Sequence, residues 1–97
     1  MANESAFQKR LKKEIKEKFP GCIIYKTDPL QLQGSPDLLI LYQNKWAALE
    51  VKRDSKAPHR PNQDYRVKQM ADMSFASFIF PENKEEVMND LERLFTS

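Results

Sequence analysis

The chain has 97 residues, of which 40% are hydrophobic and 31% charged, proportions typical of one globular domain rather than a disordered segment. No apolar run approaches the roughly 20 residues of a membrane span, and no secretory signal precedes the first charged residues. Cys22 is the only cysteine, which excludes an internal disulfide and a zinc site built on several cysteines. We therefore expect a single domain over residues 1–97, working in a reducing cytoplasm and not in a membrane.

The net charge of +2 is unevenly distributed along the chain. Residues 1–81 carry 14 Lys or Arg against 9 Asp or Glu, whereas residues 82–97 carry 2 against 5. A basic surface can neutralise phosphates and release their counterions, which favours a nucleic-acid partner. Lysine-rich helices are more often simply solvated faces, so the charge alone decides little.

The first predicted element is a helix over residues 4–19, capped by Asn3 or Ser5 and stopped by Pro20 and Gly21. Apolar residues recur at every fourth position, which predicts a stripe that faces the core: Phe7, Leu11, Ile15 and Phe19. The lysines between them belong to the solvent side. The sequence therefore begins with an amphipathic helix whose outer face is basic.

Three short strands are predicted next, at residues 22–25, 38–42 and 46–52, the last two forming a hairpin. A polar loop leads to Pro61, which suits the first position of a helix that ends near Ala71 or Met73. Residues 74–80 predict a fourth strand. Pro81 opens a last amphipathic helix whose inward positions are Val87, Met88, Leu91, Leu94 and Phe95. The order α-β-β-β-α-β-α predicts a small α/β domain with a mixed four-stranded sheet flanked by helices.

Three charged residues stand at the ends of the predicted hairpin strands. Glu50 and Lys52 are two apart on a strand, so their side chains leave the same face. If Gln43 and Asn44 form a two-residue loop, Asp37 lies opposite Glu50; a loop shifted by one residue places Asp37 opposite Lys52 instead. Both registers predict that the three side chains share a face.

Two facing carboxylates repel each other unless a cation lies between them. Lys52 supplies part of that positive charge, and a divalent metal ion can supply the rest. Carboxylates, a backbone carbonyl and water are oxygen ligands, which suit Mg²⁺ or Mn²⁺ rather than zinc. The approach to Asp37 is stiff, since Gly34 permits a close backbone contact and Pro36 fixes its own φ. Gly-Ser-Pro would also make an ordinary turn before a strand.

Together these motifs resemble the PD-(D/E)XK nuclease superfamily, and more closely its VRR-NUC branch of small stand-alone phage proteins and repair nucleases. Gly34-Ser35-Pro36-Asp37, the hairpin and Glu50-Val51-Lys52 resemble the family's active-site motif. Glu4 with Phe7-Gln8 resembles the start of its first helix, and Pro61-Asn62-Gln63 that of its second. Arg60, where the family has a small capping residue, and the absence of glycine before the fourth strand are departures. The resemblance implies a restriction-endonuclease-like fold over roughly residues 4–95.

The resemblance also implies a role for each matching residue. Asp37, Glu50 and the Val51 carbonyl would bind Mg²⁺ or Mn²⁺, and Glu4 would complete the metal shell through water or a second ion. Lys52 would position and help deprotonate the attacking water, or stabilise charge on the phosphate. Gln8 and Gln63 would orient the lysine or a phosphate. The expected DNA contacts are Gln8, Lys26, Arg53, Lys56 and Arg60, whereas His59 is expected to face solvent or DNA without a part in catalysis.

The function that follows is hydrolysis of DNA phosphodiester bonds by a magnesium-dependent endonuclease, selective for branched DNA such as four-way junctions. Symmetric cleavage of a junction needs two sites, so we expect a homodimer, with residues 75–80 or the last helix as its interface. A phage-encoded protein would act in the host cell cytoplasm. The alternatives are a nicking nuclease for ordinary duplex DNA and a non-catalytic DNA-binding module. The intact Asp37, Glu50 and Lys52 favour an enzyme over the module.

Overall fold

A computed structural model describes residues 3–28 and 30–97, and it has the predicted order of elements. The helices are α1 (Glu4–Lys18), α2 (Gln63–Met73) and α3 (Lys84–Phe95), with a short 3₁₀ helix η1 (Pro81–Asn83) before α3. The strands are β1 (Ile23–Lys26), β2 (Leu38–Tyr42), β3 (Lys45–Val51) and β4 (Ala76–Ile79). They form one sheet in the order β1-β2-β3-β4, antiparallel except for the parallel pair β3–β4. The predicted mixed α/β sheet is confirmed.

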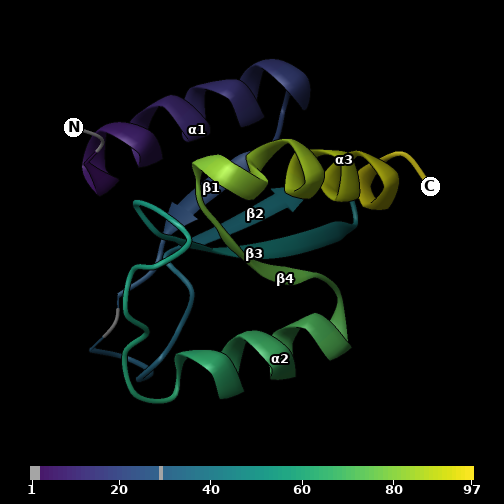
Figure 1. The fold of residues 1–97 in the computed structure, drawn as a ribbon. Helices are drawn as coiled ribbons and strands as arrows, with labels where there is room; N and C mark the ends of the chain where they lie inside the picture. The colour runs from purple at the N-terminus through teal and green to yellow at the C-terminus, as the bar shows by residue number, and fades with distance from the viewer. Residues whose placement is uncertain (1–2, 29) are drawn as a thin grey trace.

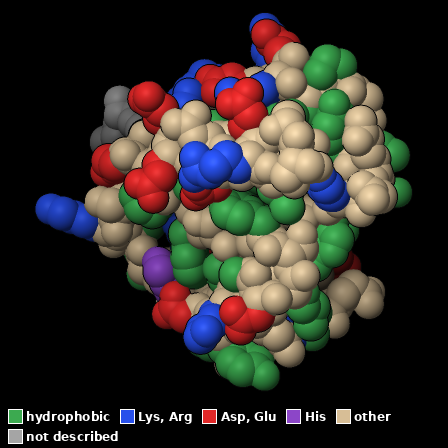
Figure 2. Space-filling view, turned by 90° about the vertical axis from the view of Figure 1, so that its right-hand side faces the viewer, with side chains coloured by type: hydrophobic (Ala, Val, Ile, Leu, Met, Phe, Trp, Pro, Cys, Tyr) green, Lys and Arg blue, Asp and Glu red, His purple; other side chains and the backbone are tan. Residues whose placement is uncertain are grey.

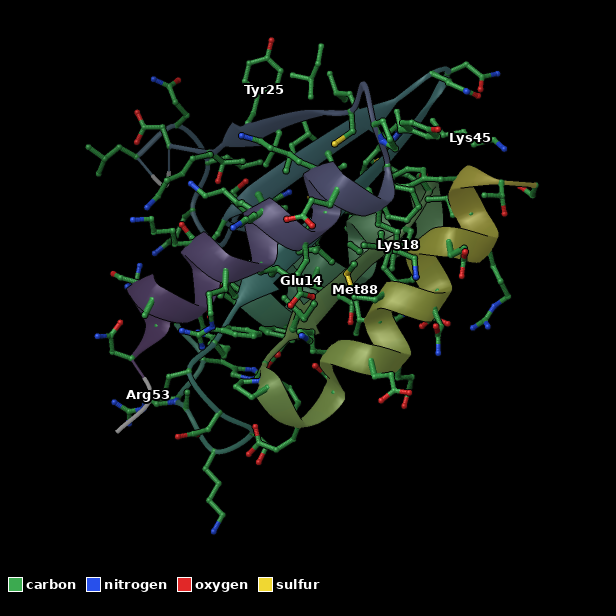
Figure 3. All side chains as sticks on the ribbon, turned by 90° about the horizontal axis from the view of Figure 1, so that it is seen from above. Glu14, Lys18, Tyr25, Lys45, Arg53 and Met88 are labelled. Atoms are coloured by element: carbon green, nitrogen blue, oxygen red, sulfur yellow. The ribbon has the colours of Figure 1, made fainter. Side chains whose placement is uncertain are left out.

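The two faces of the sheet are covered by different helices. Helices α1 and α3 lie side by side over one face, and α2 lies on the other (Figure 1). Figure 3 looks down on α1 and α3, with Glu14, Lys18 and Met88 lying between them. The larger core lies under this pair and contains the expected apolar stripes of both helices, with Leu38, Ile40 and Leu49 from the sheet. A smaller cluster of Ala48, Val67 and Ala76 lies under α2.

Alternation along β3 assigns its residues to these two faces. Ala47, Leu49 and Val51 are fully buried in the large core, whereas Ala48 belongs to the cluster under α2. Because successive side chains of a strand point to opposite faces, Glu50 shares the α2 face with Ala48. The charged end of the strand therefore lies on the face that has less apolar cover.

The predicted element boundaries need small corrections. Helix α2 begins at Gln63 and not at Pro61, because Asn62 has a left-handed backbone (φ 69°) that no α-helix continues through. Strand β1 lies one residue later than predicted and β3 one residue earlier, and β4 is shorter at both ends. Asn3, not Ser5, caps α1, since its Oδ1 accepts the Ala6 N–H at 2.7 Å.

The hairpin has the first of the two predicted turns. Tyr42 pairs with Lys45 and Leu38 with Leu49, so the loop is Gln43-Asn44 and Gln43 has a positive φ of 57°. Continuing this register by one residue places Asp37 opposite Glu50. The structure therefore confirms the register that brings the two carboxylates face to face.

Two expectations about the surface can also be compared with the structure. No helix of the described residues is long and apolar enough to cross a membrane. The two segments expected to form a dimer interface contribute mostly to the core, since Ile79, Val87, Leu91 and Phe95 are buried and Phe75 packs against the core.

Basic side chains form no continuous patch on the face drawn in Figure 2, where they alternate with acidic ones.

Candidate active site

Asp37 and Glu50 meet at one end of the β2–β3 hairpin, on the face that carries α2. Asp37 is half-buried, and its Oδ2 accepts the backbone N–H of Val51 at 3.0 Å. Glu50 is only 3% exposed. Figure 3 shows the loop end, marked by Arg53, and the turn end, marked by Lys45, at opposite ends of the sheet. The two acids are thus held at the loop end, by strand pairing and a backbone hydrogen bond.

Lys52 extends from β3 into the same place and is buried, at 5% exposure. Its ammonium donates to the Gln63 Oε1 at 2.8 Å and to the Pro58 carbonyl at 3.0 Å. Its Nζ lies 3.6 Å from the Glu50 Oε2. A buried ammonium is costly unless it is paired and hydrogen-bonded, and here acceptors surround it. Lys52 is therefore a fixed positive charge beside Glu50.

Gln63, the first residue of α2, joins the acid to the lysine. Its Nε2 donates to the Glu50 Oε2 at 2.9 Å, and its Oε1 accepts from Lys52 and from the Arg60 N–H at 2.8 Å. Because two donors face the amide oxygen and a carboxylate faces the amide nitrogen, exchanging the two atoms would break all three hydrogen bonds, so the orientation of the amide is fixed. We call Asp37, Glu50, Lys52 and Gln63 the carboxylate–lysine cluster.

The loop before Asp37 is pressed against the start of α2. A Cβ added to Gly34, whose φ is +82°, would lie 2.5 Å from the Asn62 carbonyl oxygen. Only glycine fits this approach, and the Asn62 side chain also donates to Gln33 at 2.9 Å. The contact joins the segment that carries Asp37 to the segment that carries Gln63.

Burial, together with the negative charge of Asp37, raises the pKa of Glu50 to about 7, while Lys52 partly opposes both. A carboxyl in this state keeps its proton near neutral pH unless another cation arrives. A strongly perturbed acid beside a specific charge partner is characteristic of functional sites.

The oxygen atoms at this end of the hairpin fit a hard divalent cation. Glu50 Oε1 is buried and has no hydrogen-bond partner among the described residues. Continuing the β2–β3 register puts Pro36 opposite Val51, and proline has no N–H to donate to the Val51 carbonyl. Two carboxylates and one carbonyl, completed by water, form a ligand set that suits Mg²⁺ or Mn²⁺.

Glu4, the fourth expected ligand, comes from α1. No group of three or more Asp, Glu, His or Cys side chains is arranged to hold an ion within residues 3–28 and 30–97. Glu4 is exposed at the start of α1 and lines a cavity of about 240 Å³ that Lys52 also lines. Glu4 therefore lies on the lysine side of the site, and its part in the metal shell, through water or a second ion, stays a prediction.

The remaining expected contacts are more widely placed. Gln8 is buried on α1, and among the described residues it makes no hydrogen bond to the carboxylate–lysine cluster. Lys26 pairs with Leu38, so it shares that residue's face of the sheet and not that of Asp37. Arg53, Lys56 and Arg60 are exposed in the loop that covers the cluster, and Arg53 and Arg60 line the 240 Å³ cavity.

Sequence reasoning set aside one residue that the structure places beside the site. His59 stacks on Phe78 with ring centroids 4.1 Å apart and planes 13° apart. Its Nδ1 lies 2.7 Å from the Asp64 Oδ1, and His59 lines the same cavity as Lys52. The sequence signal was the chain's only histidine, five residues before an acid at a helix start. That pattern alone is too common to indicate a site.

Comparison with known proteins adds no relative: no protein-family model matches the sequence, and no curated protein sequence matches it.

Proposed function

We propose that this protein is a metal-dependent endonuclease that hydrolyses phosphodiester bonds in DNA. The observation that carries the proposal is the buried pair of Glu50 and Lys52, joined by Gln63 and facing Asp37. One Glu50 oxygen has no hydrogen-bond partner in the part of the chain that the structure describes. A buried structural salt bridge would be expected to pair both carboxylate oxygens. The unpaired oxygen beside a second acid supports a cation-binding role instead.

Each residue of the cluster has a task in this reaction. Asp37, Glu50 and the Val51 carbonyl would hold Mg²⁺ or Mn²⁺, which when bound polarises the phosphate and activates water. Lys52 provides a fixed positive charge that stabilises the growing negative charge on the phosphate. Gln63 holds the side chains of Lys52 and Glu50 in fixed positions relative to each other. Because the Lys52 protons are directed at protein acceptors, this lysine serves as a charge and not as a proton acceptor.

DNA as the substrate is supported by the resemblance to VRR-NUC nucleases and by exposed Arg53, Lys56 and Arg60 around the cluster. Selectivity for branched DNA, a homodimer with two sites, and action in the cytoplasm belong to the same proposal. A rival is a nuclease that nicks ordinary duplex DNA as a monomer. The other rival is a non-catalytic DNA-binding module, which would have no need of an unpaired Glu50 oxygen.

The direct test is incubation of purified protein with labelled linear duplex, flap and four-way junction DNA, in Mg²⁺, Mn²⁺ or EDTA. We expect cleavage of the junction in either metal and none in EDTA. Cleavage of linear duplex at the same rate would favour the nicking nuclease. Binding without any cleavage in either metal would favour the non-catalytic module.

Oligomeric state and salt dependence are measured separately. Light scattering should give twice the 11.4 kDa mass of one chain. Each phosphate contact should make binding fall by about one log unit per log unit of salt. A monomer mass would remove the dimer and leave the nuclease proposal standing.

A further inference from the structure

His59 is held in place more firmly than a solvent-facing loop residue requires. Its ring lies flat on Phe78, and Phe78 pairs with Glu50 across the β3–β4 ladder. Both chain neighbours of His59 are tied to the carboxylate–lysine cluster: the Pro58 carbonyl accepts from Lys52, and the Arg60 N–H donates to Gln63. The position of the imidazole relative to Lys52 is therefore fixed from both sides of the chain.

The contact with Asp64 assigns the protons of the ring. The Asp64 Oδ1 lies 2.7 Å from the His59 Nδ1, and an ionised carboxylate can only accept a hydrogen bond. In the neutral ring Nδ1 therefore carries the proton, and Nε2 has a free lone pair. The ring is at the surface, where it is the purple side chain of Figure 2, and its side chain is 38% exposed. The side chain is therefore partly open to solvent.

The charged groups around the 240 Å³ cavity differ in whether they can exchange a proton near neutral pH. Arginine stays protonated, and the Lys52 ammonium is engaged with Gln63 and Pro58. Asp64 from α2 and Glu4 from α1 are exposed acids. A neutral imidazole can accept a proton on its free nitrogen and release it again, and histidine is the most frequent general base. The charged groups that face His59 are Asp64, Glu4, Lys52, Arg53 and Arg60.

We propose that His59 is the general base of the site, oriented by Asp64 and by stacking on Phe78. This inference rests on the proposed phosphodiesterase activity and names the proton acceptor that Lys52 cannot be. The Nε2 lone pair takes a proton from the attacking water while the water oxygen forms its bond to phosphorus. The bond from phosphorus to the leaving oxygen breaks, and that oxygen takes a proton from solvent water. The imidazolium then returns its proton to solvent, and one water molecule is consumed overall.

The first test is single-turnover cleavage of four-way junction DNA in Mg²⁺ by His59→Gln and Asp64→Asn. Loss of a general base should lower the cleavage rate of His59→Gln by about 10²-fold or more with unchanged DNA binding. The cleavage rate of Asp64→Asn should fall by a smaller factor. Asp72→Asn is the matched control, since Asp72 is another α2 acid, paired with Lys68 at 3.7 Å and outside the cavity lining. Cleavage by His59→Gln at the wild-type rate overturns the proposal.

Chemical rescue separates catalysis from a structural role. His59→Ala removes the ring stacked on Phe78 and leaves a space into which free imidazole fits. Added imidazole should restore cleavage, and the restored rate should follow the neutral form of imidazole as pH is varied. If His59→Ala melts at the wild-type temperature, is slow, and is not rescued, the ring is not the base.

The third readout needs no catalysis. Because the chain has one histidine, a ¹⁵N NMR spectrum of the imidazole has one set of signals. Neutral His59 should be the Nδ1–H tautomer in the wild type and shift toward Nε2–H in Asp64→Asn. A wild-type Nε2–H tautomer overturns the proposal whether or not DNA is cut. If no DNA substrate is cut by the wild type in either metal, the proposed function fails and the base assignment fails with it.

Discussion

The two faces of the sheet use the same strand for opposite purposes. On the α1 and α3 face, Leu49 has 0% exposure and packs among other apolar side chains. One residue later, on the α2 face, Glu50 is 3% exposed, and one of its oxygens is unpaired among the residues that the structure describes. Leu49 and Glu50 are therefore buried to a similar degree, but in different surroundings. The first face stabilises the fold, and the second keeps charge out of water where it can act on a ligand.

The largest expected effect is on the stability of the first face. Leu49→Ala removes a fully buried side chain and should lower the free energy of unfolding by about 2–5 kcal/mol. Leu39→Ala is the matched control. Because Leu39 is half-buried on the α2 face, this variant should lose less of the free energy of unfolding. Urea unfolding followed by circular dichroism measures both. Equal losses would mean that the two faces contribute alike to the core.

On the second face the expected effect is on activity. Lys52→Ala should slow DNA cleavage by about 10²–10³-fold, because it removes a fixed charge that stabilises the transition state. Lys45→Ala at the other end of β3 is the control, since Lys45 is bonded to Ser97 far from the cluster. Single-turnover rates on junction DNA measure the difference. Similar rates for the two variants would contradict the assigned site.

The raised pKa of Glu50 predicts a stability difference that depends on pH. The folded protein holds this proton up to about pH 7, whereas the ordinary value is 4.5, so the contribution of Glu50 to stability is present below 4.5 and is lost as pH rises through 7. Without metal, the free energy of unfolding of Glu50→Gln, measured relative to the wild type, should rise by on the order of 2–3 kcal/mol as pH increases from 4.5 to 7.

Urea unfolding at several pH values, with EDTA present, checks this prediction. Glu86→Gln is the control, because Glu86 is exposed on α3 and should show no such trend. A constant difference between Glu50→Gln and the wild type from pH 4.5 to 7 would rule out the proton linkage at this residue.

The smallest expected effect is the stabilisation by metal. At ten times its Kd, Mg²⁺ should stabilise the wild type by about 1.4 kcal/mol and leave the Asp37→Asn, Glu50→Gln double variant unchanged. Removing the two acids should itself be harmless without metal, since their mutual repulsion is relieved. Thermal unfolding in Mg²⁺ and in EDTA measures both effects. An equal Mg²⁺ shift in wild type and double variant would place the ion elsewhere.

Local pattern sufficed for the elements and for the hairpin register. The two-residue Gln43-Asn44 loop and alternation along β3 put Asp37 opposite Glu50, as the structure confirms. The start of α2 was mispredicted because Pro61 is a good first helical residue by propensity. The contact of Asn62 with Gly34 instead forces a left-handed backbone between Pro61 and the helix. The two residues of this contact are 28 positions apart in the sequence, so local sequence patterns cannot predict it.

Side-chain partners were beyond sequence reasoning for the same reason. The role of Gln63 came from a family resemblance, but its double link to Lys52 and Glu50 follows from how the 53–62 loop returns to the sheet. His59 was set aside because nothing local shows that a ring from β4 lies under it. Glu4 was expected near the ligands from the resemblance, and only three-dimensional placement shows that it lines the cavity beside Lys52.

The contact between Gly34 and Asn62 has a consequence for the order in which the protein acquires its chemistry during synthesis. Asp37 and Glu50 leave the ribosome before Gln63, and the amide that holds Lys52 is absent until α2 has been made and docked on the sheet. A nascent or partly unfolded chain therefore has the acids without the organised lysine. For the proposed nuclease, hydrolytic competence would arise only with the finished fold, and nearby nucleic acid would be protected from an immature chain.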